Sequence, residues 1–346
     1  MTPYKTTRDK LLLNKVLFIN GQPGCGKTLF TSILPTMNKV ELLNYCTEIE
    51  NICALYYLKK ISKDGASAFI KTYLDETLYN TCMSRKVNFR ITDLSSAFRD
   101  PYWIRYIIRL FNKGDQFIPK FIIDNKPILH FATHNLLPYS KILFETLSKK
   151  ILFIEILRHP LYMIKQQFLN YENLLQSSRH FHINIKKSNK EYFFWDAPYI
   201  EKKLNFNPID MAINHLCNQL SLQIKMIKIL DKKYPKNFLV ISFEEFVINP
   251  SKYLDNLEKF IGEDFTNKIS KVLKREKIPR KKLADGINLK IYKRLGWEAG
   301  EKELSEEMEL EKRMEFVKSL KPLNSSLHNF YSCIKKYDAF IKNRYY

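Results

Sequence analysis

The sequence predicts an α/β fold with a doubly wound, mostly parallel sheet flanked by helices. Short apolar runs alternate with segments of helical periodicity along most of the chain. A glycine-rich loop follows the first apolar run and leads into a helical pattern. Consecutive parallel strands need crossover connections, usually helices, so this alternation favours a parallel sheet over a series of hairpins.

Four apolar runs are predicted as strands: 15–20, 127–132, 151–157 and 238–243. Helices are expected between the later runs, at 137–149, 160–176 and 209–231. Residues 41–80 are predicted as two helices, because apolar residues from Leu42 to Leu55 and again from Ala66 to Leu78 recur at helical spacing. Residues 93–111 suggest a further helix.

We expect one α/β domain over residues 1–300, with a helical insertion at about 41–115, and a helical C-terminal extension over residues 301–346. The segment from Glu301 to Leu320 is rich in charge. Its apolar positions, Leu304, Met308, Val317 and Leu320, could pack on the main body.

Composition indicates a folded protein. The chain has 346 residues, of which 45% are hydrophobic and 14% aromatic, which argues against disorder. Its net charge of +21 suggests an anionic partner. The lysines are spread along the chain, however, so a general compositional bias competes with a dedicated polyanion surface. No helix-turn-helix, zinc or RNA-binding signature accompanies the charge, so no specific nucleic-acid partner is expected.

The cysteines and the hydropathy pattern bear on location. The six cysteines form no C-x-x-C pair, and the N-terminus has no signal-peptide pattern. No apolar run approaches the roughly 18 residues of a membrane span. We therefore expect a soluble cytoplasmic protein with no membrane span and reduced thiols.

Residues 21–28, GQPGCGKT, match the phosphate-binding pattern G-x-x-x-x-G-K-[ST]. The flanks are a strand candidate and a helix candidate, as the motif requires, which makes a chance match in a tight turn the weaker reading. Glycines let the loop amides turn inward, Lys27 adds a positive charge, and the following helix presents its N-terminus. This pattern predicts a phosphate-bearing ligand.

Two other strand candidates end in polar residues. Thr133 and His134 follow the run 127–132, and Arg158 follows the run 151–157. Ligands of open parallel sheets bind beyond the carboxyl ends of the strands. If these strands are neighbours, His134, Arg158 and the glycine loop therefore lie together.

Four segments resemble the sulfotransferases that use 3′-phosphoadenylyl sulfate. Residues 23–28 are similar to the family's 5′-phosphosulfate loop, commonly P-K-S-G-T-T, and residues 132–136 resemble its K-T-H-L-P segment. Residues 157–160, with Gln166, resemble its R-N-P-x-D-x-x-x-S element, and residues 243–250 resemble Y-E-D-L-x-x-N-P. The segments occur in the family's order and frame residues 15–262.

The resemblance implies a P-loop-containing, sulfotransferase-like fold, transfer of a sulfuryl group to a hydroxyl or amine of a small molecule or saccharide, and no metal. It assigns the 5′-phosphosulfate to the loop residues Pro23, Gly24, Cys25, Gly26, Lys27 and Thr28. Arg158 would bind the 3′-phosphate, with Gln166 at the family's serine position and the basic run 275–282 closing over it. His134 would accept the acceptor's proton.

This chain departs from the family pattern at its loop. Gly24 stands where the family often has a catalytic lysine, and Lys27 stands where it has threonine. Lys27 could supply the missing charge at the leaving oxygen. Ala132 and Tyr162 also replace a lysine and an aspartate of the pattern.

Other readings remain open at this stage. His134 could be a strand-end histidine satisfied by backbone, and His130 and His159 compete for its role. Arg158 could pair with Glu155 or with a helix carboxylate. The basic run could be a solvated turn. The alternative function is an ATP-dependent P-loop kinase or another nucleotide-binding protein, for which Asp124 is the candidate magnesium carboxylate.

Overall fold

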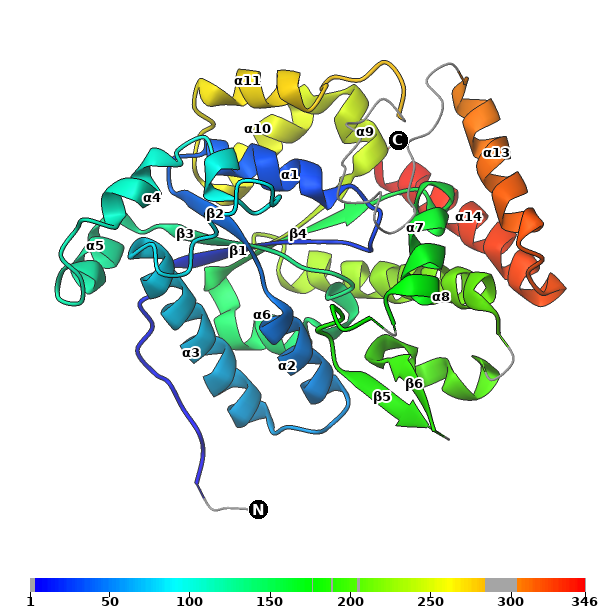
Figure 1. The fold of residues 1–346 in the computed structure, drawn as a ribbon, viewed down its shortest axis with the longest axis horizontal. Coiled ribbons are helices and arrows are strands. Elements are labelled where there is room, and N and C mark those ends of the chain that lie inside the picture. Colours follow the sequence, from blue (N-terminus) through cyan, green and yellow to red (C-terminus); the bar gives the residue numbers. More distant parts are fainter. Residues whose placement is uncertain (1–3, 176, 188, 204–205, 284–303, 346) are drawn as a thin grey trace.

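The computed structural model describes residues 4–175, 177–187, 189–203, 206–283 and 304–345. Its centre is a five-stranded sheet in which every pairing is parallel (Figure 1). The strands, in sheet order, are β2 (Val40–Tyr45), β3 (Ile128–Ala132), β1 (Lys15–Asn20), β4 (Ile151–Leu157) and β7 (Phe238–Ser242). The predicted α/β class and its four predicted strands are confirmed.

The central strands are apolar because both of their faces are covered. Every residue of β3 and of β4 is buried. Across the sheet Phe18 of β1 stacks between Phe131 of β3 and Phe153 of β4, with ring centroids 5.5 and 6.1 Å apart. Continuous apolar runs are typical of parallel strands buried in this way.

The prediction that residues 41–46 begin a helix is wrong. Residues 41–45 belong to β2, which pairs with β3 at Leu43 and His130, and Cys46 is the N-cap of α2 (Thr47–Tyr57). The reason is a long-range contact: Arg109 binds the buried Glu41 through Nη1 and Nη2 at 2.8 and 2.9 Å. Burial alone would raise the pKa of Glu41, but Arg105 and Arg109 lower it to about 2. Local periodicity cannot reveal such a partner.

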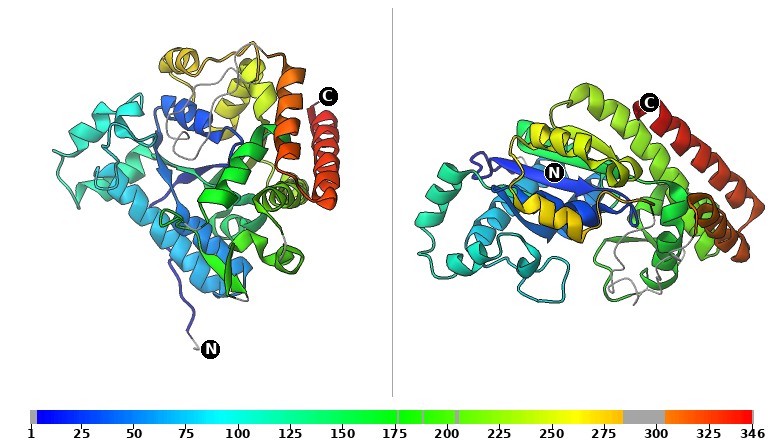
Figure 2. Two further views of the ribbon diagram at one scale, coloured as in Figure 1. Left: turned by 45° about the vertical axis from the view of Figure 1, so that its right-hand side comes forward. Right: turned by 90° about the horizontal axis from the view of Figure 1, so that it is seen from above.

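Helices cover both faces of the sheet. In Figure 1, α1, α10 and α11 lie on one face and α2, α3 and α6 on the other, and Figure 2 shows the same layers from two further sides. The helices of the main body are α1 (Lys27–Ile33), α2, α3 (Lys63–Cys82), α4 (Ile104–Arg109), α5 (Phe117–Asn125), α6 (Lys141–Leu147), α7 (Pro160–Asn173), α8 (Pro208–Lys233), α9 (Phe243–Ile248), α10 (Pro250–Ile261) and α11 (Lys268–Arg275).

Two segments differ from the sequence prediction. The helix expected over 93–111 is limited to a single 3₁₀ turn (Ala97–Arg99) and α4, with turns between them. An antiparallel pair, β5 (Asn184–Lys187) and β6 (Lys190–Phe193), forms a small second sheet that the sequence did not indicate. It is followed by a 3₁₀ segment (Phe194–Lys203).

The C-terminal residues fold back as two helices. The first, α13 (Glu306–Ser319), contacts α7, and the second, α14 (Asn324–Tyr345), runs along α8 (Figure 1). Val317 and Phe330 are fully buried in the same hydrophobic core as the sheet residues, whereas Met308 is 52% exposed. The predicted packing of this segment is therefore confirmed at Val317 and not at Met308; residues 301–303 lie outside the described residues.

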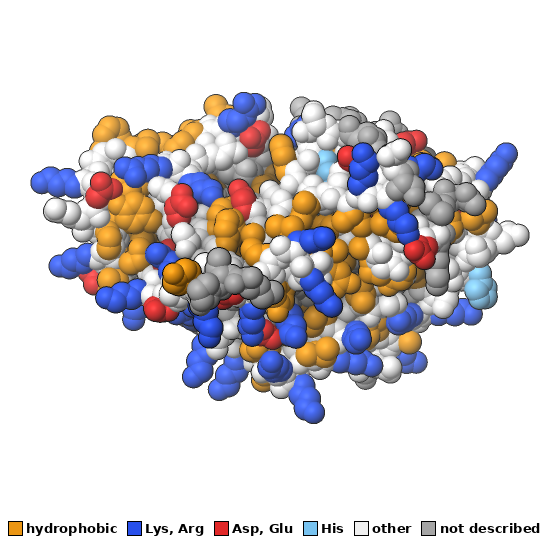
Figure 3. All heavy atoms as spheres, turned by 90° about the horizontal axis from the view of Figure 1, so that it is seen from below, with side chains coloured by type: hydrophobic (Ala, Val, Ile, Leu, Met, Phe, Trp, Pro, Cys, Tyr) orange, Lys and Arg blue, Asp and Glu red, His pale blue; other side chains and the backbone are white. Residues whose placement is uncertain are grey.

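Basic side chains are numerous on the face drawn in Figure 3. Lysines and arginines lie among apolar and acidic side chains there and are denser along its lower edge (Figure 3). In the part of the chain that the structure describes, no helix combines the length and apolarity that a membrane crossing requires.

Candidate functional site

The glycine loop, residues 21–28, lies between the carboxyl end of β1 and α1, at the centre of the sheet where the strand order turns to either side. Gly24 and Gly26 have φ angles of +93° and +88°, a region that favours glycine. A Cβ atom on Gly26 would stand 2.2 Å from the ring of Phe243. The two glycines therefore hold a turn that other residues would strain.

Lys27 is built into this loop. Its Nζ donates to the carbonyl oxygen of Gly21 at 3.2 Å, and only 6% of the residue is exposed. Burial lowers the pKa of Lys27, while the nearby Cys25, Glu50 and Glu155 oppose that change. The amide of Cys25 donates to Gln22 within the loop, and burial raises the pKa of its thiol.

Asn20, the last residue of β1, ties three strand ends together. Its Nδ2 donates to Glu155 of β4 at 2.6 Å. Its Oδ1 accepts from Thr133 Oγ1 at 2.9 Å and from the amide of Leu136 at 3.0 Å. The segment that carries His134 is therefore fixed beside the glycine loop, as the convergence of parallel strand ends predicts.

Arg158 contacts the loop directly. Its Nη1 donates to the carbonyl oxygen of Gly24 at 2.9 Å, and its guanidinium carbon lies 4.3 Å from the ring centre of Phe243. Its buried Nε has no hydrogen-bond partner within the described part of the chain. Of the carboxylates considered from the sequence, Glu155 binds Asn20 and Gln223 instead. A helix carboxylate, Glu244 of α9, does act on Arg158: burial lowers the pKa of the guanidinium and Glu244 opposes that change.

Two more arginines contact the aromatic rings that Arg158 contacts. The guanidinium of Arg280, from the basic run 275–282, lies 5.4 Å from the same Phe243 ring, and its amide donates to Val247. Arg313 of α13 lies 4.8 Å from the ring of Tyr162, over which Arg158 also lies at 5.0 Å. The sequence pattern suggested a role for the run that holds Arg280, but nothing in it pointed to Arg313.

His134 is held by a carboxylate that the sequence analysis missed. Its Nδ1 lies 3.5 Å from Glu50 Oε1, and its amide donates to the same oxygen. The other oxygen of Glu50 lies 2.6 Å from His182 Nε2. Burial alone would raise the pKa of Glu50, but the hydrogen bonds from His134 and His182 lower it to about 2. We call Glu50, His134 and His182 the Glu50 cluster.

The electrostatics keep His134 neutral. Burial and the nearby Lys27 lower its pKa to about 4, although Glu50 opposes them. With Nδ1 directed at Glu50, the proton of the neutral ring belongs on Nδ1 and the lone pair on Nε2. His134 is therefore arranged to accept a proton at neutral pH.

The competing histidines have other surroundings. His130 lies inside β3 and is fully buried, which lowers its pKa to about 3. His159 precedes α7, and its Nδ1 accepts from the amide of Leu161, as a helix N-cap does. His134, in contrast, lines a cavity beside the glycine loop.

This cavity, the His134 cavity, has a volume of about 240 Å³ and lies next to the loop. Its wall includes Pro23 of the loop, both glutamines of α7, and aromatic residues of the 181–195 segment. The lining residues are Pro23, Thr47, His134, Asn135, Gln166, Gln167, Asn170, Tyr171, Leu174, Arg179, His180, Phe181, His182, Phe193 and Trp195. Gln166 thus reaches the cavity, and its neighbour Gln167 donates to the carbonyl oxygen of Pro23 at 2.9 Å.

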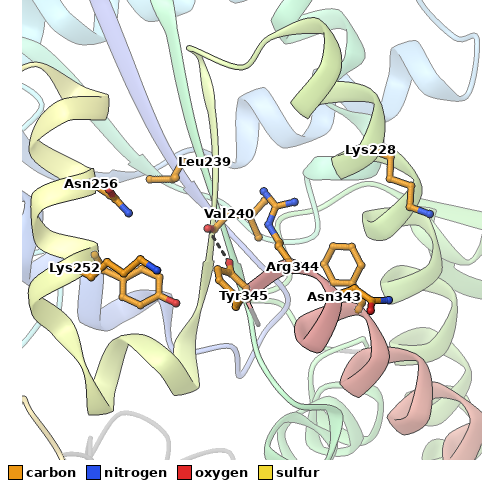
Figure 4. A pocket seen from close by; sticks show the side chains of 10 residues that line it. Lys228, Leu239, Val240, Lys252, Asn256, Asn343, Arg344 and Tyr345 are labelled. Atoms are coloured by element: carbon orange, nitrogen blue, oxygen red, sulfur yellow. Dashed lines mark hydrogen bonds between the residues drawn. The ribbon is translucent and has the colours of Figure 1, made fainter.

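A larger hollow of about 730 Å³ lies elsewhere, beside the edge strand β7 between α10 and α14 (Figure 4). Its lining includes Lys228, Lys252 and Arg344, and Tyr345 donates to the carbonyl oxygen of Val240. None of the site residues predicted from the sequence lines it.

Asp124, the carboxylate that a kinase reading needs, is exposed near the end of α5. Lys126 and Pro127 separate that helix from the start of β3. Asp124 therefore lies toward the amino end of the sheet, and the glycine loop lies at the carboxyl end. The structure does not bring the two together.

The fold and the loop define a parallel α/β protein with a phosphate-loop sequence at its strand-order switch. No family model and no curated protein matches the chain. Solved structures that it resembles are sulfotransferases, the family that the sequence motifs resemble.

One is the sulfotransferase domain of the Synechococcus PCC 7002 olefin synthase, 14% identical, with a TM-score of 0.39 over 90% of this chain and 98% of that one. The sulfotransferase domain of the curacin biosynthetic pathway is 14% identical, with a TM-score of 0.42 over 88% and 98%. Sulfotransferase STF9 from Mycobacterium avium is 11% identical, with a TM-score of 0.39 over 91% and 78%. The function is therefore inferred from the residues of the site.

Proposed function

We propose that this protein is a sulfotransferase that moves the sulfuryl group of 3′-phosphoadenylyl sulfate to a hydroxyl or amine. The observation that carries the proposal is the contact between Arg158 and Gly24. It puts a guanidinium beside the glycine loop. Because only a ribose separates the two phosphates of an adenosine 3′,5′-bisphosphate, this placement suits the loop for the 5′ group and Arg158 for the 3′ group.

Each loop residue has a role in binding the 5′-phosphosulfate of the donor. Gly24 and Gly26 leave room for the backbone to approach an anion, and Pro23, Cys25 and Thr28 complete the turn. Lys27 carries the charge that stabilises the leaving oxygen as the bond from phosphate to sulfur breaks. Gln166 lines the cavity and lies near Gly24, with its Oε1 3.4 Å from the place of a Cβ there, which supports a place for it beside the donor.

His134 provides the base. Its Nε2 accepts the proton of the acceptor hydroxyl or amine as that atom bonds to sulfur, and Glu50 stabilises the resulting imidazolium. The His134 cavity holds the acceptor. Arg280, near Arg158, supports the role predicted for the basic run around the 3′-phosphate. The six cysteines, all free, support a reducing compartment such as the cytoplasm.

The test is binding of adenosine 3′,5′-bisphosphate by calorimetry in buffer containing a chelator. We expect saturable binding that needs no magnesium. The kinase alternative, favoured by the complete G-K-T of the loop, predicts instead that ATP with magnesium binds and is consumed. If ATP with magnesium binds and the bisphosphate does not, the sulfotransferase proposal is abandoned.

A further inference from the structure

We propose that Asn135 binds a second polar group of the acceptor, next to the hydroxyl or amine that reacts. The site would then select compact acceptors that carry two adjacent hydrogen-bonding groups. The identity of the pocket as an acceptor site rests on the function proposed above; the contact made by Asn135 does not depend on turnover.

The first observation is an unsatisfied amide. Asn135 is 1% exposed, and neither its Nδ2 nor its Oδ1 has a hydrogen-bond partner among the residues that the structure describes. Burying a polar group without a partner costs on the order of 1–3 kcal/mol. Asn135 is among the residues that line the His134 cavity, so the partner that we propose is a molecule bound there.

The second observation is the backbone of this residue. Asn135 has a φ of +53°, and its amide approaches the carbonyl oxygen of Gly21 at 3.4 Å. The residue is thus anchored between the glycine loop and the preceding His134. Because His134 and Asn135 are consecutive and line one cavity, the proposal is that one acceptor contacts both side chains.

The third observation is the size and wall of the cavity. Its volume of about 240 Å³ lies below the roughly 300–1,000 Å³ of sites for drug-sized ligands. Phe193 and Trp195 stack with ring centroids 4.6 Å apart, and together with Tyr171 they give the cavity an aromatic wall. Such a space suits a single ring, and Asn135 offers both a donor and an acceptor at its edge.

The test compares ligands that differ only in the second group: catechol against phenol, and vicinal cyclohexanediol against cyclohexanol. Equilibrium binding is measured by calorimetry with saturating adenosine 3′,5′-bisphosphate. We expect the two-group member of at least one pair to bind about fivefold tighter, as one additional hydrogen bond allows. The pair that shows the preference distinguishes an aromatic from an alicyclic acceptor.

The variant Asn135→Gly removes the amide and keeps a residue that accepts positive φ. It should reduce the preference for the two-group compound to less than twofold. Asn135→Asp loses the Nδ2 donor but keeps an acceptor. Its preference for the two-group compound should therefore lie between that of the unchanged protein and that of Asn135→Gly. Asn189→Gly is the matched control, since Asn189 also has a positive φ, +62°, but is exposed in the turn between β5 and β6.

Equal binding within both pairs, or no binding of any of the four compounds, would overturn this inference whether or not the protein transfers sulfate. A preference that survives in Asn135→Gly would also overturn it. Conversely, failure of the bisphosphate to bind would refute the donor assignment, while acceptor binding measured without it would still test Asn135.

Discussion

Arg158 Nη1 and the carbonyl oxygen of Gly24 are 2.9 Å apart, so the end of β4 is bound directly to the loop that follows β1. The two strands are neighbours in the sheet, with Ile19 opposite Ile154. A guanidinium and a glycine turn that are 134 residues apart in sequence therefore lie side by side, as the proposed donor site requires. Several consequences of this arrangement can be measured.

The contact of Arg158 with the loop leads to a prediction about binding of the 3′-phosphate. Replacing Arg158 by lysine keeps the charge but removes the planar fork, so we expect at least tenfold weaker binding of adenosine 3′,5′-bisphosphate. Binding of adenosine 5′-phosphate, which lacks the 3′ group, should change less than twofold. Calorimetry with both nucleotides gives the comparison.

Arg344→Lys serves as the matched control, because Arg344 pairs with Asp231 on the surface formed by α14 and α8, away from the loop. Equal losses for the two nucleotides in Arg158→Lys would show that Arg158 supports the loop and does not read the 3′-phosphate.

The Glu50 cluster leads to a prediction about pH. The pKa of His134, lowered to about 4 by burial and Lys27, keeps the ring neutral over a wider range than the ordinary value near 6.5 allows. We expect kcat/KM to remain nearly constant from pH 7.5 to about pH 5 and to fall as the pH approaches 4. His134→Ala should lower kcat by about 10²–10⁴-fold and leave bisphosphate binding intact.

Glu50→Gln keeps a hydrogen-bond acceptor for His134 but removes the charge that favours its protonated form. We expect a smaller loss in kcat than for His134→Ala and an acid limb at lower pH. An acid limb near pH 6.5 in the unchanged protein would contradict the role assigned to His134.

These residues also show what sequence can and cannot predict. The strands β1, β3 and β4 can be predicted from their apolar runs, because strands buried on both faces are apolar along their length. The glycine loop and its position follow from a local pattern. The strand β2 escaped detection because its stability depends on Glu41 meeting Arg109, a partner 68 residues away.

The site residues that the sequence did not predict also depend on partners that are distant in the chain. Glu50 lies on α2 and meets His134 only because β2 and β3 are neighbours. Arg313 comes from the C-terminal α13, and Asn135 is identified by an unsatisfied buried amide, which only coordinates reveal. Local motifs predict which groups stand at strand ends; the partners that orient them come from tertiary structure.

The tight contact in the glycine loop predicts a folding defect. In Gly26→Ala the new Cβ would stand 2.2 Å from Phe243, at a φ of +88° that alanine rarely adopts. We expect a loss of stability of about 1–3 kcal/mol and loss of bisphosphate binding. Gly65→Ala in α3 is the comparison: its φ is not positive and its nearest neighbour, Ser62 Oγ, is 3.1 Å away, so the loss of stability should be smaller than in Gly26→Ala. Urea unfolding of both variants measures the difference, and equal stability would refute the strain assigned to Gly26.

Glu155 provides the last prediction, on stability against pH. It is fully buried at the end of β4, and burial raises its pKa to about 8, although Asn20 and Gln223 donate to it and oppose the shift. Between pH 4.5, the ordinary pKa of a glutamate, and pH 8, the folded protein therefore holds a proton on Glu155 that the unfolded chain has released. This contribution to stability is complete below pH 4.5 and is lost as the pH rises to about 8; a shift of this size corresponds to roughly 4–5 kcal/mol.

Glu155→Gln removes the titration, and the surroundings can accept the amide. Asn20 still donates to the side chain at position 155. Gln223 can turn its amide over so that its oxygen accepts from the new amide. Gln22, whose Oε1 has no hydrogen-bond partner within the described chain, can then turn its own amide over and accept from Gln223. We expect the variant to be more stable than the unchanged protein at pH 8.5 and nearly equal at pH 5, by urea unfolding. Glu315 on α13 is exposed, so Glu315→Gln should leave the free energy of unfolding unchanged at both pH values. Parallel stability curves for Glu155→Gln and the unchanged protein between pH 5 and 8.5 would mean that Glu155 is already ionised in the fold.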